Sequence, residues 1–282
     1  MNLDTIVCMD ALEFLATLPN ASVDMILCDL PYGSTACSWD EIIPFAPMWE
    51  QFTRVSKPRA AIVLTASQPF TSKLVMSNLQ MFHESLIWDK TAATGYLDAN
   101  RKHMRQHEDV IVFCAGQPEY TPQLTKGKAY THHGRSSNFS GYGVAATKPT
   151  TSNGDRYPKT ILSYSGSAAA YARIHPTQKP VALFEYLIRT YTQSDQIVLD
   201  CCMGSGTTAI AARNTGRHFI GCDNGTDGCR GAFGRCAEIC SRSYSRSCAA
   251  RCIIVGMINM PHRTIMILMA AALTLASCGT LY

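Results

Sequence analysis

The tetrad Asp29-Leu30-Pro31-Tyr32 contains the residue types best suited to chemistry in this chain. It directly follows the apolar run 23–28, which is typical of a buried strand that the proline turn would end. An acid and an aromatic ring are therefore expected at the carboxyl end of a strand, where open α/β sheets bind ligands. Asp29 and the Leu30 carbonyl could accept hydrogens from a weakly nucleophilic amino group, while Tyr32 stacks on the ring that carries it. An ordinary turn uses the same residue types, so the tetrad alone does not decide between the two readings.

A second stretch is typical of a site for a nucleotide-like ligand. Residues 196–200 predict a buried strand ending in Asp200, followed by a glycine turn and a helix over 209–214. Glycines let the backbone approach a ligand closely, but this Gly-x-Gly turn matches neither the dinucleotide fingerprint nor a phosphate loop. The next predicted strand, 217–222, is followed by Asp223, where an acid can bind the ribose hydroxyls of a nucleoside. A nucleoside without a pyrophosphate indicates S-adenosylmethionine, and the turn residues expected to contact it are Cys202, Met203, Gly204, Ser205, Gly206 and Thr207.

The rest of the chain up to residue 115 alternates strand and helix patterns that would position these motifs. Strands are predicted at 5–9, 60–65, 84–88 and 109–114, and helices at 11–18, 48–55, 70–79 and, further on, 181–192. This alternation favours an α/β fold with a doubly wound, mostly parallel sheet. The polar residues 90–105, interrupted by a glycine, predict a flexible loop.

Residues 116–175 interrupt the alternation and carry a local positive charge. Seven basic residues stand against two acids, and six of the twelve tyrosines of the chain lie in this segment. Basic residues interleaved with aromatic ones suit contacts to phosphates and bases, although a solvated surface insert would have the same composition. The residues predicted to contact nucleic acid are Lys126, Lys128, Arg135, Lys148, Arg156 and Lys159.

These motifs together resemble the amino-directed DNA methyltransferases. The tetrad comes first and the Asp-x-x-x-Gly-x-Gly loop second, as in the β-class of that family, whose target-recognition region lies between the two. Three further stretches match in order, namely 67–71 (Ser-Gln-Pro-Phe-Thr), 88–90 (Trp-Asp-Lys) and 175–180 (His-Pro-Thr-Gln-Lys-Pro). The resemblance covers residues 1 to about 223. It implies a Rossmann-like methyltransferase domain over 1–223, in which 116–175 is an irregular target-recognition insert.

The resemblance also implies roles for the residues. Asp29, Leu30, Pro31 and Tyr32 would hold and stack on a base flipped out of the duplex, with S-adenosyl-L-methionine as cofactor. Residues 200–207 would frame the cofactor and Asp223 its ribose. Thr177 and Lys179, from the stretch that resembles a cofactor-binding segment of the family, would hold the carboxylate at the methionine end.

The implied reaction is methylation of adenine N6 in DNA. N4-cytosine methylation shares the scaffold, and serine in place of Asp29 would favour it. Methylation of RNA or of a protein glutamine is a further alternative, although glutamine-directed enzymes need no basic insert. The unusual C-terminus keeps open a catalytically impaired nucleic-acid-binding relative. DNA is the expected partner, a homodimer is left open, and the sequence indicates no obligate protein partner, no metal and no membrane association of the catalytic domain.

Two departures from the family pattern stand out. Cys201-Cys202 replace the usual Pro-Phe, which predicts looser packing around the cofactor or, as a rival, a redox role for the two thiols. Residues 224–282 form an Arg- and Cys-rich stretch followed by an apolar one, and we interpret them as a shifted reading frame or a fusion. This tail carries the whole net charge of +4. The cytoplasm is the expected location because no N-terminal signal peptide is apparent.

Overall fold

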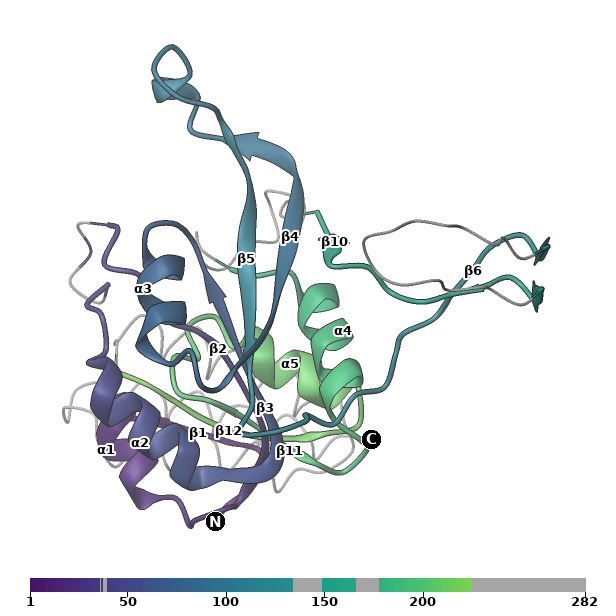
Figure 1. The fold of residues 1–282 in the computed structure, drawn as a ribbon. Coiled ribbons are helices and arrows are strands. Elements are labelled where there is room, and N and C mark those ends of the chain that lie inside the picture. Colours follow the sequence, from purple (N-terminus) through teal and green to yellow (C-terminus); the bar gives the residue numbers. More distant parts are fainter. Residues whose placement is uncertain (36, 38–39, 134–148, 166–177, 225–282) are drawn as a thin grey trace, which may run out of the picture.

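The apolar runs of the sequence form strands of one main sheet in the computed structural model, which describes residues 1–35, 37, 40–133, 149–165 and 178–224 (Figure 1). Its strands are β1 (Thr5–Cys8), β2 (Val23–Asp29), β3 (Ser56–Ala66), β4 (Phe82–Thr94), β5 (Arg105–Phe113), β10 (Ile161–Ser163), β11 (Ile197–Asp200) and β12 (His218–Asp223). Their order across the sheet is β1-β12-β11-β2-β3-β5-β4-β10. Only β5 runs antiparallel to its neighbours in this sheet. The predicted mostly parallel α/β sheet is confirmed.

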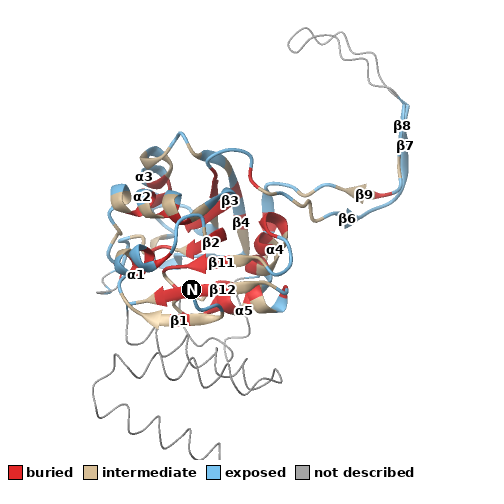
Figure 2. Ribbon diagram, turned by 90° about the horizontal axis from the view of Figure 1, so that it is seen from below, coloured by how far each residue is buried: buried red, intermediate tan, exposed pale blue. Residues whose placement is uncertain are grey.

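Both faces of the sheet are buried. Successive side chains of a strand point to opposite sides, so each inner strand contributes to a core cluster on either face. On β2, Met25 and Leu27 belong to one core cluster, whereas Ile26 and Cys28 belong to the other. The first cluster includes side chains of α4 (Val181–Tyr191) and α5 (Thr207–Asn214). Helices α1 (Ala11–Thr17), α2 (Phe45–Val55) and α3 (Phe70–Ser77) contribute to the second. The buried strands are therefore covered by helices on both sides (Figure 2).

The strand order reverses direction between β2 and β11, at the centre of the sheet. The chain passes from β2 through α2 to β3 on one side, and from β11 through α5 to β12 on the other. In open α/β sheets such a reversal leaves a crevice beyond the carboxyl ends of the two central strands. These ends are Asp29 of β2 and Asp200 of β11. The two stretches singled out in the sequence thus meet at one point of the fold.

Strands β4 and β5 form a hairpin that extends well beyond the body of the sheet (Figure 1). Strand β4 continues to Thr94, the 3-10 helix η1 (Tyr96–Asp98) occupies the tip, and β5 begins at Arg105. The prediction of a flexible loop over 90–105 is wrong for 90–94 and 105. The strands extend through polar residues because the backbone pairing of the hairpin continues past the apolar core.

The predicted insert 116–175 has two kinds of structure in its described part. Short strands β6 (Thr125–Lys126), β7 (Tyr130–His132), β8 (Thr150–Ser152) and β9 (Asp155–Arg156) pair as β6–β9 and β7–β8 in an arm that projects from the body (Figure 2). Strand β10 instead joins the main sheet beside β4. Residues 134–148, 166–177 and the predicted tail from 225 onward lie outside the described residues. Within the described part of the chain, no helix is long and apolar enough to cross a membrane.

Gly221 on β12 is a position where only hydrogen fits. A Cβ atom added there would lie 2.5 Å from the backbone oxygen of Asp200 and would overlap Cε of Met203. We expect Gly221→Ala to lower the free energy of unfolding by about 1–3 kcal/mol, the usual cost of overpacking. Urea denaturation would measure the loss. Gly116→Ala is the matched control, because no atom lies within 4 Å of its added Cβ. Equal stability of the two variants would contradict the close approach of β11 and β12.

Candidate active site

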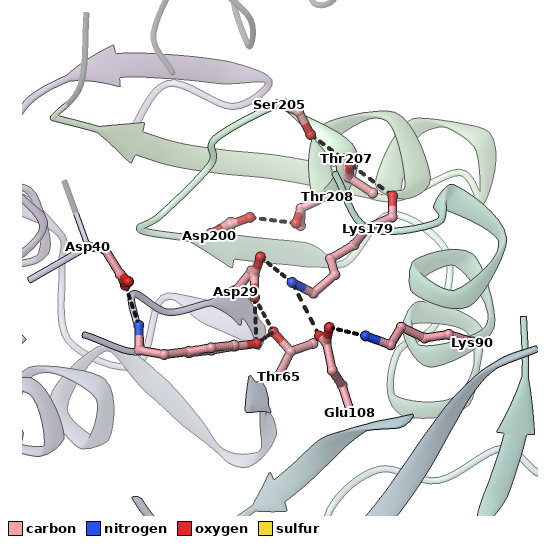
Figure 3. Close-up of polar contacts among 11 residues, drawn as sticks. Asp29, Asp40, Thr65, Lys90, Glu108, Lys179, Asp200, Ser205, Thr207 and Thr208 are labelled. Carbon is pink, nitrogen blue, oxygen red and sulfur yellow. Dashed lines mark hydrogen bonds and ion pairs between the residues drawn. The ribbon is translucent and has the colours of Figure 1, made fainter. Parts of the chain in front are cut away.

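The carboxylate of Asp29 is held by side chains from three separate segments (Figure 3). Its Oδ1 accepts hydrogen bonds from the hydroxyls of Tyr32 at 2.9 Å and of Thr65, at the end of β3, at 2.5 Å. Its Oδ2 lies 2.6 Å from Nζ of Lys179, which precedes α4. A carboxylate offers about four acceptor positions, so one on Oδ2 is left for a ligand. The lining of the adjacent pocket includes Asp29.

Lys179 carries a nearly buried ammonium between two carboxylates. It is 8% exposed, and its Nζ lies 3.5 Å from Oε2 of Glu108 as well as beside Asp29. The other oxygen of Glu108 accepts a hydrogen bond from Lys90 at 3.0 Å. Burial alone would lower the pKa of Lys179, but the two carboxylates outweigh it and raise the pKa above its ordinary value. The four side chains form a chain of alternating charge.

The ring of Tyr32 is packed between partners. Phe70 of α3 stacks on it with ring centres 5.2 Å apart, and Nζ of Lys179 lies over the ring, 5.7 Å from its centre. Burial, together with the charges of Asp29 and Glu108, raises the pKa of the phenol well above its ordinary value. The hydroxyl therefore stays protonated and donates to Asp29.

One carboxylate fixes the loop that follows the tetrad. Asp40, 8% exposed, accepts hydrogen bonds from four successive backbone N–H groups, and also from a side-chain hydroxyl of the loop. Oδ1 takes the N–H groups of Tyr32 and Gly33, and Oδ2 takes those of Ser34 and Thr35, at 2.7–2.9 Å. Thr35 Oγ1 also donates to Oδ2 at 2.7 Å. Burial alone would raise the pKa of Asp40, but these hydrogen bonds outweigh it and hold the pKa below its ordinary value.

A pocket lies where the carboxyl ends of β2 and β11 meet, and most of the predicted cofactor residues line it. Its lining consists of Asp29, Lys179, Phe184, Asp200, Cys202, Met203, Gly204, Ser205, Thr207 and Thr208. Asp200 is 2% exposed, accepts a hydrogen bond from Thr208 Oγ1 at 2.5 Å, and also accepts one from the N–H of Cys202 at 2.9 Å. Burial raises the pKa of Asp200 to about 7.

The glycine turn around this pocket needs left-handed backbone. Gly204 has φ +50° and Gly206, which precedes α5, has φ +76°, a region that disfavours side chains. The N–H of Gly204 donates to Oδ2 of Asp223 at 2.7 Å. Asp223, predicted to bind ribose, is thus tied to the turn, and its carboxylate is not among the groups that line the pocket.

One predicted cofactor residue has different partners, and several residues of the site were missed. The ammonium of Lys179, predicted to hold a ligand carboxylate, contacts the protein carboxylates Asp29 and Glu108 instead. Thr177 lies outside the described residues. Cys201 is buried with its Sγ 3.7 Å from that of Cys28, whereas Cys202 lines the pocket. Sequence reasoning missed the contacts of Thr65, Phe70, Lys90, Glu108, Asp40, Phe184 and Thr208.

Of the described residues predicted to bind nucleic acid, Lys126, Lys128 and Arg156 lie on the projecting arm, and Lys159 lies between the arm and β10. Lys126 pairs with Asp155, and the guanidinium of Arg156 lies 4.6 Å from the ring centre of Tyr130. Lys128 and Lys159 are exposed. Arg135 and Lys148 lie outside the described residues.

Comparison with known proteins identifies the family. A family described as DNA methylase (N6_N4_Mtase) matches residues 23–233. The type II methyltransferase M1.MboII of Moraxella bovis is 26% identical over 241 residues, covering 76% of this chain and 89% of its own length. M.HpaI of Haemophilus parainfluenzae is 28% identical over 231 residues, covering 77% and 69%.

Solved structures agree in fold. A complex of M1.HpyAVI with SAM superposes with a TM-score of 0.57 at 20% identity, covering 82% of this chain and 98% of that one. The PvuII cytosine-N4-specific DNA methyltransferase gives 0.58 at 15% identity, covering 93% and 90%. This chain therefore belongs to the DNA methylase family of amino-methyltransferases, whose cofactor is S-adenosyl-L-methionine. The glycine turn, the switch-point pocket and its polar lining fit such a ligand.

We expect Asp40→Ala to lower the free energy of unfolding by about 1–3 kcal/mol, because four backbone N–H groups lose a charged acceptor. The carboxylate has a depressed pKa in the folded chain, so its contribution is fully present above the unfolded value of about 3.9. It is lost as the pH falls through the lower folded pKa. Urea denaturation of wild type and variant at several pH values would measure this.

The difference between the two proteins should stay constant from pH 7 to pH 5 and shrink in stronger acid. Asp40→Asn, which keeps one acceptor oxygen, should lose less than Asp40→Ala. A difference that is independent of pH down to pH 3 would contradict the charged role of Asp40.

Proposed function

We propose that this chain methylates N6 of adenine in DNA, at a specific short sequence and in the cytoplasm. The single observation that carries the proposal is the carboxylate of Asp29, held in the same pocket as the glycine turn. S-adenosyl-L-methionine, held by the residues that line this pocket, would supply an electrophilic methyl group. The protein has to bring a planar amine to that methyl group and orient its lone pair.

Asp29 and the Leu30 carbonyl orient the amine. The acceptor position left on Oδ2 of Asp29 takes one amino hydrogen, and the Leu30 carbonyl takes the other, so that the nitrogen lone pair faces the methyl group. The bound cofactor would supply the methyl group and leave as a neutral thioether, and the methylated amine would then release its proton to solvent. Positioning supplies most of the acceleration in such an in-line transfer.

The target base has to leave the double helix, because its amino group cannot reach the pocket while stacked. Tyr32 stacks on the flipped base, and Pro31 fixes the turn that presents it. The packing of Phe70 against the Tyr32 ring supports this role, since it holds the ring in one orientation.

We assign the other predicted residues the roles that the resemblance to the family implies. Residues Asp200, Cys202, Met203, Gly204, Ser205, Gly206 and Thr207 surround the cofactor, with Thr177 near its methionine end and Asp223 toward its ribose. Lys126, Lys128, Arg135, Lys148, Arg156 and Lys159 contact DNA. The catalytic domain comprises residues 1–223, with target recognition in 116–175, and we propose that the tail from 224 onward is foreign to the fold.

N4-cytosine methylation is the second candidate, because the attack on the methyl group is the same. The likeness to the PvuII enzyme supports the shared fold alone. Serine at the first position of the tetrad would favour cytosine, so the aspartate found there, Asp29, favours adenine.

We expect cells that express this chain to carry methylated adenine in one short DNA motif, as read by long-read sequencing. Asp29→Ala should abolish the mark, while calorimetry shows nearly unchanged binding of S-adenosyl-L-methionine. Asp10→Ala, which removes the side-chain cap of α1, is the control and should retain methylation. Methylated cytosine would select the second candidate. Loss of cofactor binding together with activity would mean that the tetrad is misassigned.

We expect a double variant, Lys128→Ala with Lys159→Ala, to weaken DNA binding on all sequences. Each lost phosphate contact should reduce the slope of log affinity against log salt by about 1. Fluorescence anisotropy of a labelled duplex at several salt concentrations would measure it. Arg59→Ala is the control, because Arg59 is an exposed basic residue near the amino end of β3, and its contact with Glu119 uses the backbone carbonyl that the variant keeps. The same slope in the wild type, the double variant and Arg59→Ala would show that Lys128 and Lys159 do not contact DNA phosphates.

A further inference from the structure

Glu108 contacts the pocket-lining residue Lys179 but belongs neither to the tetrad nor to the pocket lining itself. It lies on β5, at the base of the projecting hairpin, with its side chain 17% exposed. Its Oε1 accepts a hydrogen bond from Lys90 on the neighbouring strand β4, on which Trp88 is the residue paired with Glu108. Its Oε2 is buried and receives no hydrogen bond from the residues that the structure describes, and the ammonium of Lys179, 3.5 Å away, is the charged group facing it.

A buried carboxylate oxygen without a hydrogen bond is unusual in proteins and calls for a reason. A distance of 3.5 Å is longer than a hydrogen bond, whereas the contact of Lys179 with Asp29 is tight at 2.6 Å. The ammonium therefore has a tight contact on one side and a looser one on the other. A small shift toward Glu108 would loosen its hold on Oδ2 of Asp29 without leaving the charge unpaired.

We propose that Glu108 is a positioning residue for methyl transfer, which acts through Lys179 to set how strongly Asp29 is engaged. When the target amine arrives, Oδ2 of Asp29 has to accept its hydrogen while Lys179 remains in place. Glu108 offers the ammonium a second partner at that moment. It also keeps the flexible lysine stem from leaving the site, because two carboxylates on separate strands fix its end. Lys90 balances Glu108, so that the network has two positive and two negative charges.

This inference rests on the proposed function, and its first test is kinetic. We expect Glu108→Gln to lower kcat for DNA methylation about 10- to 100-fold, the effect of a small displacement of a reacting group. Binding of S-adenosyl-L-methionine by calorimetry should not change. Glu84→Gln is the matched control, because Glu84 lies on the same hairpin but accepts a hydrogen bond from Tyr191, at the end of α4 remote from Lys179. It should retain kcat.

A double-mutant cycle separates action through Lys179 from direct action. In a Lys179→Met background, Glu108→Gln should have no further effect on kcat, because the residue through which it acts is gone. Effects that multiply would overturn the proposal. A loss of cofactor affinity in Lys179→Met equal to the loss of kcat, with Glu108→Gln silent, would instead make Lys179 a ligand of the cofactor carboxylate.

A second measurement does not depend on activity. The titration of Lys179 can be followed by NMR in the full chain labelled with ¹³C-lysine, with Lys179→Arg to assign the signal. Glu108→Gln removes a negative charge beside the ammonium, so the Lys179 transition should move to lower pH. Asp29, Tyr32 and Asp200 also face this region and stay unchanged in the variant. An unmoved transition would overturn the proposal even if the wild-type chain methylates DNA. A shifted transition in a chain that leaves DNA unmodified would contradict the proposed function only.

Discussion

The need to pair a nearly buried ammonium determines how this site is built. Lys179 comes from the segment before α4, and Asp29 from the end of β2, 150 residues earlier in the chain. An unpaired charge in the interior would be very costly, so the two segments have to meet. Their meeting sets the approach of α4 to the central strands. It also closes one wall of the pocket, since both residues line it together with Phe184 of α4.

The second constraint is the reversal of strand order between β2 and β11. Parallel strands bring their carboxyl ends to one edge, and the helices that follow leave in opposite directions. Asp29 and Asp200 therefore face the same crevice although they lie far apart in the sequence. The two carboxylates differ in their surroundings. Asp29 has a cation beside it, whereas Asp200 is buried with hydroxyl and N–H donors, and burial raises its pKa to about 7.

The sequence predicts this framework well because apolar periodicity and glycine turns are local signals. The strand before Asp29, the strand before Asp200 and the α/β class are confirmed. Side-chain partners are a different matter, because they depend on how distant segments are placed. The direction in which Lys179 points cannot be read from the Pro-Thr-Gln-Lys-Pro stretch, which suits a ligand carboxylate equally well.

The residues around Lys179 were missed for a related reason. The predicted strand began at Asp109, because the preceding residues are polar and have no apolar alternation. Backbone pairing in the hairpin extends the strand to Arg105 and places Glu108 beside the site. Asp40 was passed over because a lone aspartate after a Gly-Ser-Thr stretch is common in loops. Its five hydrogen bonds appear only when the loop folds back on it.

Stability is a poor explanation for the four-charge network. Removing two ion pairs from water costs about as much as their attraction returns, and apolar replacements of similar volume are often as stable. Lys57 and Asp24 form an ion pair at the opposite end of β2, in which the lysine is half exposed. The carboxylate of Asp24 also accepts a hydrogen bond from the backbone N–H of Ile197. The network of Lys90, Glu108, Lys179 and Asp29 has no comparable backbone contact among its described hydrogen bonds. The network instead ends on Asp29, whose carboxylate lines the pocket, which is the place where charge can guide a reaction.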